Sequence, residues 1–233
     1  MRIFFKGFNF SQDGPGNRLV FHLQGCNMKC PWCSNPEGMS FDGGTEYSVD
    51  EVVREAVRSR ALFFSGGGVT FTGGEATVQW SELLEVLKKL RDLGIHTAIE
   101  TNGSSQHLPE IQKYVDYLMM DFKHFDDERF LEFTGTRIDS VKRNFEYLTG
   151  IGRQLHIRIP LINHVNADSP EGFAEYFSRF DKGNTVFEFL PYHEYGKDKW
   201  KGEYKITDAF VSDEQIETFK KVFARYSLRV IET

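Results

Sequence analysis

Three closely spaced cysteines are the residues of this chain best suited to chemistry. Cys26, Cys30 and Cys33 are its only cysteines and have the spacing C-x3-C-x2-C. Thiolates are soft ligands that bind zinc, copper(I) or iron–sulfur clusters. An odd number of cysteines on one short loop is a poor basis for disulfides. The spacing therefore predicts a metal centre on this loop.

The alternatives for this loop are an iron–sulfur cluster, a zinc site or buried structural cysteines. A four-iron cluster held by three cysteines leaves one iron without a protein ligand, and an open coordination position is where chemistry takes place. A zinc site would need His22 as a fourth ligand, but this histidine lies on the preceding predicted strand. The spacing also differs from the C-x2-C pattern of zinc sites, and structural cysteines would not require it. We favour the iron–sulfur cluster.

Strands and helices are expected to alternate along the chain. Continuous apolar runs, which are typical of buried strands, and other β-prone segments predict strands; these are Arg18–Gln24, Val69–Thr72, His96–Glu100, Tyr117–Phe122, Leu155–Leu161, Val186–Leu190 and Leu228–Ile231. Capping signals and apolar stripes predict the helices; these are 48–60, Trp80–Leu93, Pro109–Tyr114, Asp127–Phe133, Ser140–Leu148, a helix from Ser169-Pro170 and one over 212–226.

The alternation predicts an α/β fold with parallel strands joined by right-handed crossovers. About six strand–helix units are fewer than the eight of a closed barrel. We therefore expect an open, partial (β/α)6 TIM-like barrel, with a flat doubly wound sheet as the competing architecture. No linker or repeat divides the chain, so residues 1–233 are expected to form one domain.

The composition excludes several classes of protein. Hydrophobic residues make up 40% of the 233 residues, which is ordinary for a globular protein, and the net charge of -6 disfavours nucleic-acid binding. No stretch approaches the ~18 apolar residues of a membrane span, and the first residues do not resemble a secretory signal. We expect a cytoplasmic protein that binds neither nucleic acid nor membranes.

Six segments together resemble a known family. In chain order they are Asp13-Gly-Pro-Gly-Asn-Arg18, Gln24-Gly-Cys26 to Pro36, Thr72-Gly-Gly-Glu75, Thr101-Asn-Gly103, Met119-Met-Asp-Phe-Lys123 and Leu190-Pro-Tyr-His-Glu-Tyr-Gly-Lys197. The cysteine spacing after a first strand resembles the radical S-adenosylmethionine (radical SAM) superfamily. The surrounding residues are most similar to the activating enzymes of glycyl radical enzymes, in particular the activators of pyruvate formate-lyase.

The resemblance implies an oxygen-sensitive oxidoreductase that works under anaerobic conditions. Cys26, Cys30 and Cys33 would hold a 4Fe–4S cluster whose open iron chelates S-adenosylmethionine. In the family, an electron from the cluster cleaves the sulfonium bond, and the resulting 5′-deoxyadenosyl radical abstracts a Cα hydrogen from a glycine of the partner enzyme. The cofactors carry this chemistry, while the protein orients them and excludes water.

The resemblance also implies the residues that bind the cofactor. The expected contacts are Trp32, Cys33, Ser34, Asn35, Gly73, Gly74, Glu75, Asp121, Phe122, Lys123, Arg158 and His193. Equivalent positions in the family hold a monovalent cation, which implies Glu100, Thr101, Met119 and Asp121 as its ligands, although Glu100 replaces the usual Asp. Asp13 is a candidate contact for the partner's glycine loop, whereas His96 and His156 are expected to be structural.

The resemblance leaves the partner open between pyruvate formate-lyase and a related glycyl radical enzyme, because Ser34 stands where the activators of pyruvate formate-lyase usually have histidine. Residues 39–69 contain no cysteine, so no ferredoxin-like insert is expected. A separate flavodoxin or ferredoxin would then donate the electron to a monomeric enzyme. The alternatives are another radical SAM reaction on a small molecule, such as that of the 7-carboxy-7-deazaguanine synthases, and a zinc- or cluster-bearing binding module.

Overall fold

The computed structural model describes residues 1–201 and 204–231. They form two compact units. The first unit contains residues 1–27, 35–101 and 105–119, and the second contains residues 28–34, 102–104 and those from 120 onward. The cysteine loop is divided between them, since Cys26 belongs to the first unit and Cys30 and Cys33 belong to the second.

The first unit is built on a mostly parallel sheet. Its strands are β1 (Arg2–Phe10), β2 (Asn17–Leu23), β3 (Thr45–Glu46), β4 (Gly68–Gly73), β5 (Thr97–Thr101) and the start of β6 (Tyr117–Asp121). Their order is β3-β1-β2-β4-β5-β6. β1 pairs antiparallel with β2 and β3, whereas β2 with β4 and β4 with β5 pair parallel. The carboxyl ends of β2 and β4 therefore meet at one edge of the sheet.

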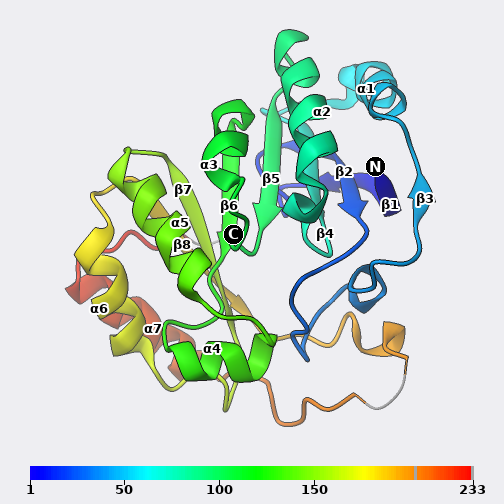
Figure 1. Cartoon of the computed structure of the whole chain (residues 1–233). Coiled ribbons are helices and arrows are strands. Elements are labelled where there is room, and N and C mark those ends of the chain that lie inside the picture. The colour runs from blue at the N-terminus through cyan, green and yellow to red at the C-terminus, as the bar shows by residue number, and fades with distance from the viewer. Residues whose placement is uncertain (202–203, 232–233) are drawn as a thin grey trace. The chain divides into compact units, whose positions relative to one another are not determined.

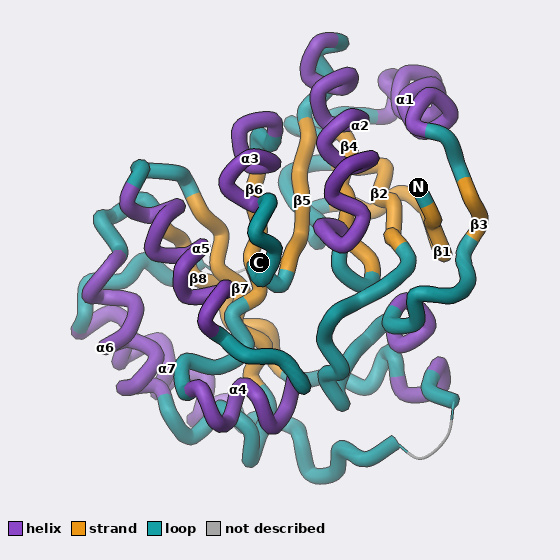
Figure 2. Tube along the Cα trace, viewed as in Figure 1, coloured by secondary structure: helices purple, strands orange, loops and turns teal. Residues whose placement is uncertain are grey.

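The first unit has helices at the three places where the sequence predicts them, and further short helical turns that were not predicted. They are η1 (Pro36–Gly38), α1 (Val49–Arg58), η2 (Arg60–Leu62), η3 (Ala76–Gln79), α2 (Trp80–Asp92), α3 (Leu108–Ile111) and η4 (Gln112–Tyr114). The side chain of Ser48 accepts a bond from the Glu51 amide, and Glu51 bonds back to the Ser48 amide, which completes a capping box. α1 packs beside α2 (Figure 1). The buried face of α2 carries a stripe of leucines. Most of the connection from β2 to α1 is loop (teal in Figure 2).

The second unit continues the alternation around an aromatic core. After the end of β6 come α4 (Asp127–Thr134), α5 (Asp139–Gly150), β7 (Leu155–Leu161), α6 (Pro170–Phe180), β8 (Thr185–Pro191), η5 (Lys197–Lys199) and α7 (Asp213–Arg225). β7 and β8 pair parallel over their whole length, in the order β6-β7-β8. The ring of Phe177 lies 4.7 Å from that of Phe187 and 4.8 Å from that of Phe122. α6 packs on α7 and closes this core.

The predicted fold class is confirmed. Among the described residues, the parallel strands β2, β4, β5, β6, β7 and β8 alternate with helices, which is the topology of an open (β/α)6 barrel. The antiparallel β1 and the short β3 were not predicted. The predicted strand Leu228–Ile231 is wrong, since the structure has only a single bridge between Val230 and Phe187 there. Within the described part of the chain, no helix has the length and apolar character needed to cross a membrane.

We predict that Phe177→Ala destabilises the protein by about 3–5 kcal/mol, because Phe177 is fully buried and its loss leaves a cavity among aromatic rings. Chemical denaturation followed by circular dichroism measures this free energy of unfolding. Leu131→Ala is the control, because Leu131 is 45% exposed on α4, and it is expected to cost less than about 0.5 kcal/mol. Equal losses for the two variants would show that the aromatic core does not stabilise the fold.

Candidate active site

The first cysteine is held by the turn that follows β2. The Gly25 amide donates to the Gly38 carbonyl at 2.9 Å, and the Cys26 amide donates to the Met39 carbonyl at 3.2 Å. The buried side chain of Gln24 donates to the carbonyls of Glu37 and Ser40. The backbone around Cys26 is therefore fixed by several hydrogen bonds within the first unit.

A glycine at the end of β4 lies directly against this turn. The Gly74 amide donates to the Leu23 carbonyl at 2.9 Å, and the next amide, of Glu75, donates to the Gly25 carbonyl at 2.8 Å. A Cβ on Gly74 would lie 2.2 Å from the Gly38 oxygen and 2.4 Å from the Gly25 oxygen. No side chain fits in this space, so Gly74 is required for β4 to end beside the backbone that precedes Cys26.

Glu75 connects the ends of two strands. Its carboxylate is buried and accepts hydrogen bonds from the Thr77 amide at 3.0 Å and from Thr101 Oγ1 at 2.6 Å. These bonds cap η3 and fix Thr101 at the end of β5. Glu75 therefore has a structural role in the fold, whatever it contacts in the presence of a cofactor.

The other two cysteines are held within the second unit. Cys30 is buried and Cys33 is partly exposed, and the Cys33 amide donates to the Cys30 carbonyl at 3.1 Å. The Lys29 amide donates to the Thr134 carbonyl at the end of α4, and the Trp32 ring lies 6.0 Å from that of Phe133. This half of the loop is therefore anchored on α4, and Trp32 is a packing residue through its side chain.

Asp121, at the carboxyl end of β6, forms ion pairs with two basic side chains. Lys123 Nζ lies 3.1 Å from one carboxylate oxygen, and Arg158 Nε on β7 lies 3.3 Å from the other. Burial alone would raise the pKa of Asp121, but the charges of Lys123 and Arg158 outweigh it and hold this pKa below its usual range. The three side chains are mostly buried, which distinguishes them from a solvated surface pair.

The side chain of Phe122, an expected cofactor contact, lies inside the fold. Its side chain is fully buried in the aromatic core, and its amide donates to the Arg158 carbonyl at 2.8 Å. Its side chain is therefore packed in the fold, and its carbonyl is the group through which it could meet a ligand.

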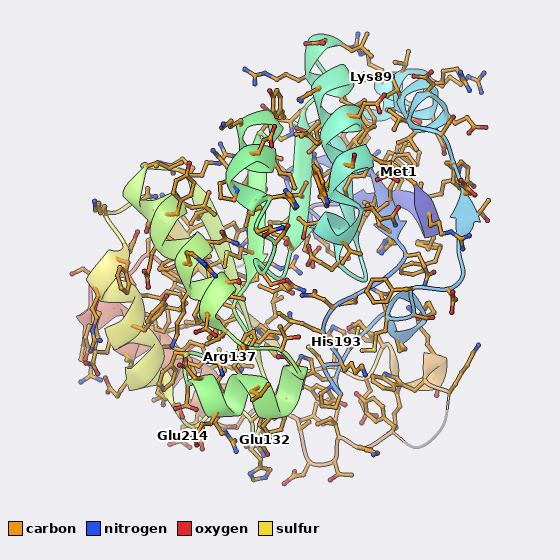
Figure 3. The ribbon with its side chains drawn as sticks, in the orientation of Figure 1. Met1, Lys89, Glu132, Arg137, His193 and Glu214 are labelled. Atoms are coloured by element: carbon orange, nitrogen blue, oxygen red, sulfur yellow. The ribbon has the colours of Figure 1, made fainter. Side chains whose placement is uncertain are left out.

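His193 lies on the segment after β8 (Figure 3). Its ring stacks on the exposed ring of Tyr195 with the centroids 4.3 Å apart. Partial burial lowers the pKa of His193, so the imidazole is neutral at neutral pH and can both donate and accept a hydrogen bond.

Asp13 lies at the other end of the strands. Its backbone carbonyl accepts a hydrogen bond from Thr70 Oγ1 at 2.7 Å, and its carboxylate accepts one from Nδ2 of the Asn9 side chain. Fully buried Arg18 donates to Thr70 Oγ1 and to the Pro15 carbonyl, and burial lowers the pKa of Arg18 to about 10. This loop precedes the amino ends of β2 and β4, whereas Cys26 follows the carboxyl end of β2.

The donor set suits an iron–sulfur cluster. The three cysteines form no disulfide, and Cys26 and Cys33 are partly exposed, so their thiolates are accessible to a soft metal. The packing of Gly74 against Gly25 fixes the backbone before the first of them. In the described residues, no three His, Cys, Asp or Glu side chains gather around the position of a single ion. The His22 ring packs against those of Phe4 and Phe5.

The predicted cation ligands are also divided between the units. Glu100, Thr101 and Met119 belong to the first unit, at the ends of β5 and β6, and Asp121 belongs to the second. Thr101 and Met119 are buried, whereas Glu100 is partly exposed. Their role in holding a cation stays a prediction.

Comparison with known proteins supplies the family. The model of the radical SAM superfamily matches residues 20–177. The pyruvate formate-lyase-activating enzyme of Clostridium pasteurianum is 34% identical over 210 residues, which cover 87% of this chain and 88% of that protein. The enzyme of the same name from Staphylococcus epidermidis (strain ATCC 12228 / FDA PCI 1200) is 32% identical over 201 residues, covering 81% and 80%.

Solved structures agree with these relatives. A domain of a pyruvate-formate lyase-activating enzyme from Bacteroides vulgatus ATCC 8482 has a TM-score of 0.60 at 26% identity, and the match covers 71% of this chain and 98% of that one. SuiB of Streptococcus suis, in a structure bound to S-adenosylmethionine, has a TM-score of 0.69 at 17% identity, covering 88% and 47%, and shares the fold. This chain is thus a radical SAM enzyme, and it belongs to the family of pyruvate formate-lyase-activating enzymes.

Proposed function

We propose that this enzyme activates a glycyl radical enzyme, either pyruvate formate-lyase or a relative of it. The observation that carries the proposal is the cysteine loop itself, with three thiols that form no disulfide and with the end of β4 packed on the backbone before the first. The names of the relatives, which align over most of both chains, support the same partner class.

Cys26, Cys30 and Cys33 would hold a 4Fe–4S cluster, and S-adenosylmethionine would occupy its open position. When bound, these two cofactors supply a carbon-centred radical that can take a hydrogen atom from a glycine Cα. The chain itself binds the cofactors, orients them and excludes water. A partner glycine must enter the same site, since a hydrogen atom passes only between carbon atoms that are in contact.

The charged residues of the second unit would bind the polar parts of S-adenosylmethionine. Asp121 holds the mostly buried cations of Lys123 and Arg158 in place, and both cations suit the carboxylate or the ribose of the cofactor. Neutral His193 would hydrogen bond to the nucleoside side. The backbone of Trp32 to Asn35 would meet the adenine, and that of Gly73 to Glu75 would meet the methionine amino group.

Further parts of the proposal concern the partners. Glu100, Thr101, Met119 and Asp121 would bind a monovalent cation through oxygen atoms. The role of Asp13 as a contact of the partner stays a prediction, and its loop lies at the amino ends of β2 and β4. A flavodoxin or ferredoxin would supply the electron to a monomeric enzyme in an anaerobic cytoplasm.

The metal content tests the first step. Anaerobic reconstitution with iron and sulfide is expected to give about four irons and four sulfides per chain, and Cys33→Ala is expected to lose most of both. Ser34→Ala changes the neighbouring side chain and should retain the cluster. One zinc per chain, bound in place of iron, would contradict the proposal and favour a zinc-binding module.

The reaction distinguishes an activator of a glycyl radical enzyme from a radical SAM enzyme that acts on a small molecule. The reduced holoenzyme is expected to form 5′-deoxyadenosine from S-adenosylmethionine, and a co-expressed glycyl radical enzyme should then show a glycyl signal in electron paramagnetic resonance. Cleavage without any glycyl signal in such partners would favour a reaction on a small molecule. Absence of cleavage would exclude the radical reaction.

Asp121→Asn is expected to lower the free energy of unfolding at pH 7 by about 1–3 kcal/mol, because Lys123 and Arg158 lose their partly buried partner. The carboxylate has a lowered pKa in the folded state, so its contribution is present above about pH 4 and is lost as the pH falls further through the folded pKa. Wild type and variant should therefore converge in acid, as measured by denaturation at several pH values. Glu85→Gln, which removes an exposed pair with Lys89, should cost less than about 0.5 kcal/mol; an equal loss would contradict the role of Asp121.

A further inference from the structure

A short segment after β8 lies directly on the second half of the cysteine loop. We name this segment, Gly196–Lys201, the strap. Trp200 Nε1 donates a hydrogen bond to the Cys33 carbonyl at 3.1 Å, and Lys199 Nζ donates one to the Ser34 carbonyl, also at 3.1 Å. Trp200 and Cys33 are 167 positions apart in the sequence, so only the fold brings them together.

The backbone of the strap also touches the loop. A Cβ on Gly196 would lie 2.5 Å from Ser34 Cα and 2.7 Å from the Ser34 oxygen. Only a glycine allows the strap to approach this closely. The contact therefore involves both side chains and backbone on two successive residues of the loop, Cys33 and Ser34.

Contacts behind the strap fix the position of Trp200. Its ring meets that of Tyr204 edge to face at 5.7 Å, and the Tyr204 hydroxyl lies 2.7 Å from that of buried Tyr192. The amide of Lys197 donates to the Glu194 carbonyl, and its ammonium group lies 2.9 Å from the Glu194 carboxylate. Trp200 is therefore a supported donor rather than a freely rotating side chain.

Peptide planarity gives these hydrogen bonds a second effect. In a trans peptide, the carbonyl of one residue and the amide N–H of the next point in opposite directions. Trp200 holds the Cys33 carbonyl, so the Ser34 N–H is directed away from the strap. Lys199 holds the Ser34 carbonyl and in the same way directs the Asn35 N–H.

We propose that Trp200, assisted by Lys199, is a positioning residue that orients the Ser34 and Asn35 N–H groups toward the nucleoside of S-adenosylmethionine. This rests on the proposed function, in which the same loop backbone meets the adenine. Peptide N–H groups match the acceptor nitrogens of a purine, and a fixed peptide plane avoids the cost of ordering the loop on binding. Trp200 contributes more than Lys199, whose bond is exposed to solvent.

The test uses Trp200→Phe, which removes the N–H and keeps a ring against Tyr204. In the anaerobic holoenzyme, the Kd of S-adenosylmethionine by calorimetry and its KM are expected to rise about fivefold, which corresponds to one lost hydrogen bond. The kcat, the iron content and the Tm should stay close to wild type. 5′-Deoxyadenosine should bind about fivefold more weakly to the variant, whereas methionine should bind unchanged.

Two further variants keep the test decisive if Trp200→Phe folds poorly. Lys199→Met should weaken nucleoside binding by about twofold, as expected for an exposed bond. Lys201→Met changes another exposed lysine of the strap and should bind like wild type. If Lys199→Met and Lys201→Met were indistinguishable in that case, the proposal would be overturned.

Other outcomes overturn different parts. An unchanged Kd in well-folded Trp200→Phe, or an equal loss for 5′-deoxyadenosine and methionine, would overturn the positioning role. Loss of iron from this variant would show that Trp200 supports the cluster instead. A wild-type holoenzyme that binds iron but no S-adenosylmethionine would overturn the proposed function, and with it the role of Trp200.

Discussion

The close approach of Gly74 to the turn after β2 is the constraint on which the first half of the site depends. The Gly74 amide donates to the last carbonyl of β2 and the Glu75 amide donates to a carbonyl of the turn, and no Cβ fits between the backbones. The contact fixes the end of β4 relative to the residue before Cys26. It also places the Glu75 carboxylate where it can bond Thr101 and so fix the end of β5. The carboxyl ends of three neighbouring strands, β2, β4 and β5, are therefore positioned by contacts that require glycine at position 74.

The second half of the site is positioned by side-chain contacts rather than by a close approach of backbone. Cys30 and Cys33 lie on a loop anchored on one side by α4 and on the other by the strap. At the end of β6, Asp121 pairs with both Lys123 and Arg158 and so holds two cations near each other. A carboxylate between two cations reduces the cost of burying them and keeps their donors in place for an anionic ligand. Rigid strands and helices thus position loops that would otherwise have many conformations.

The sequence predicted the parts of the fold that depend on local pattern. The parallel strands and the helices with capping boxes at Ser48 and Ser212 lie within one or two residues of their expected ranges, because apolar periodicity and caps act over a few residues. β1 was missed because its aromatic residues, such as Phe8 and Phe10, are exposed and do not follow the burial pattern of a central strand. Leu228–Ile231 is apolar enough for a strand but makes a single bridge. Trp200 was missed as a contact of Cys33, since no local pattern reveals a hydrogen bond between residues so distant in sequence.

Electron–nuclear double resonance on the reduced holoenzyme shows whether S-adenosylmethionine binds the iron that the three cysteines would leave open. The experiment uses S-adenosylmethionine labelled with nitrogen-15 at its amino group and oxygen-17 at its carboxylate. We expect hyperfine coupling of both labels to the cluster, because both would bind the one iron that Cys26, Cys30 and Cys33 leave open. Absence of coupling from either label, in an enzyme that carries the cluster and has bound the cofactor, would show that no such open iron binds S-adenosylmethionine.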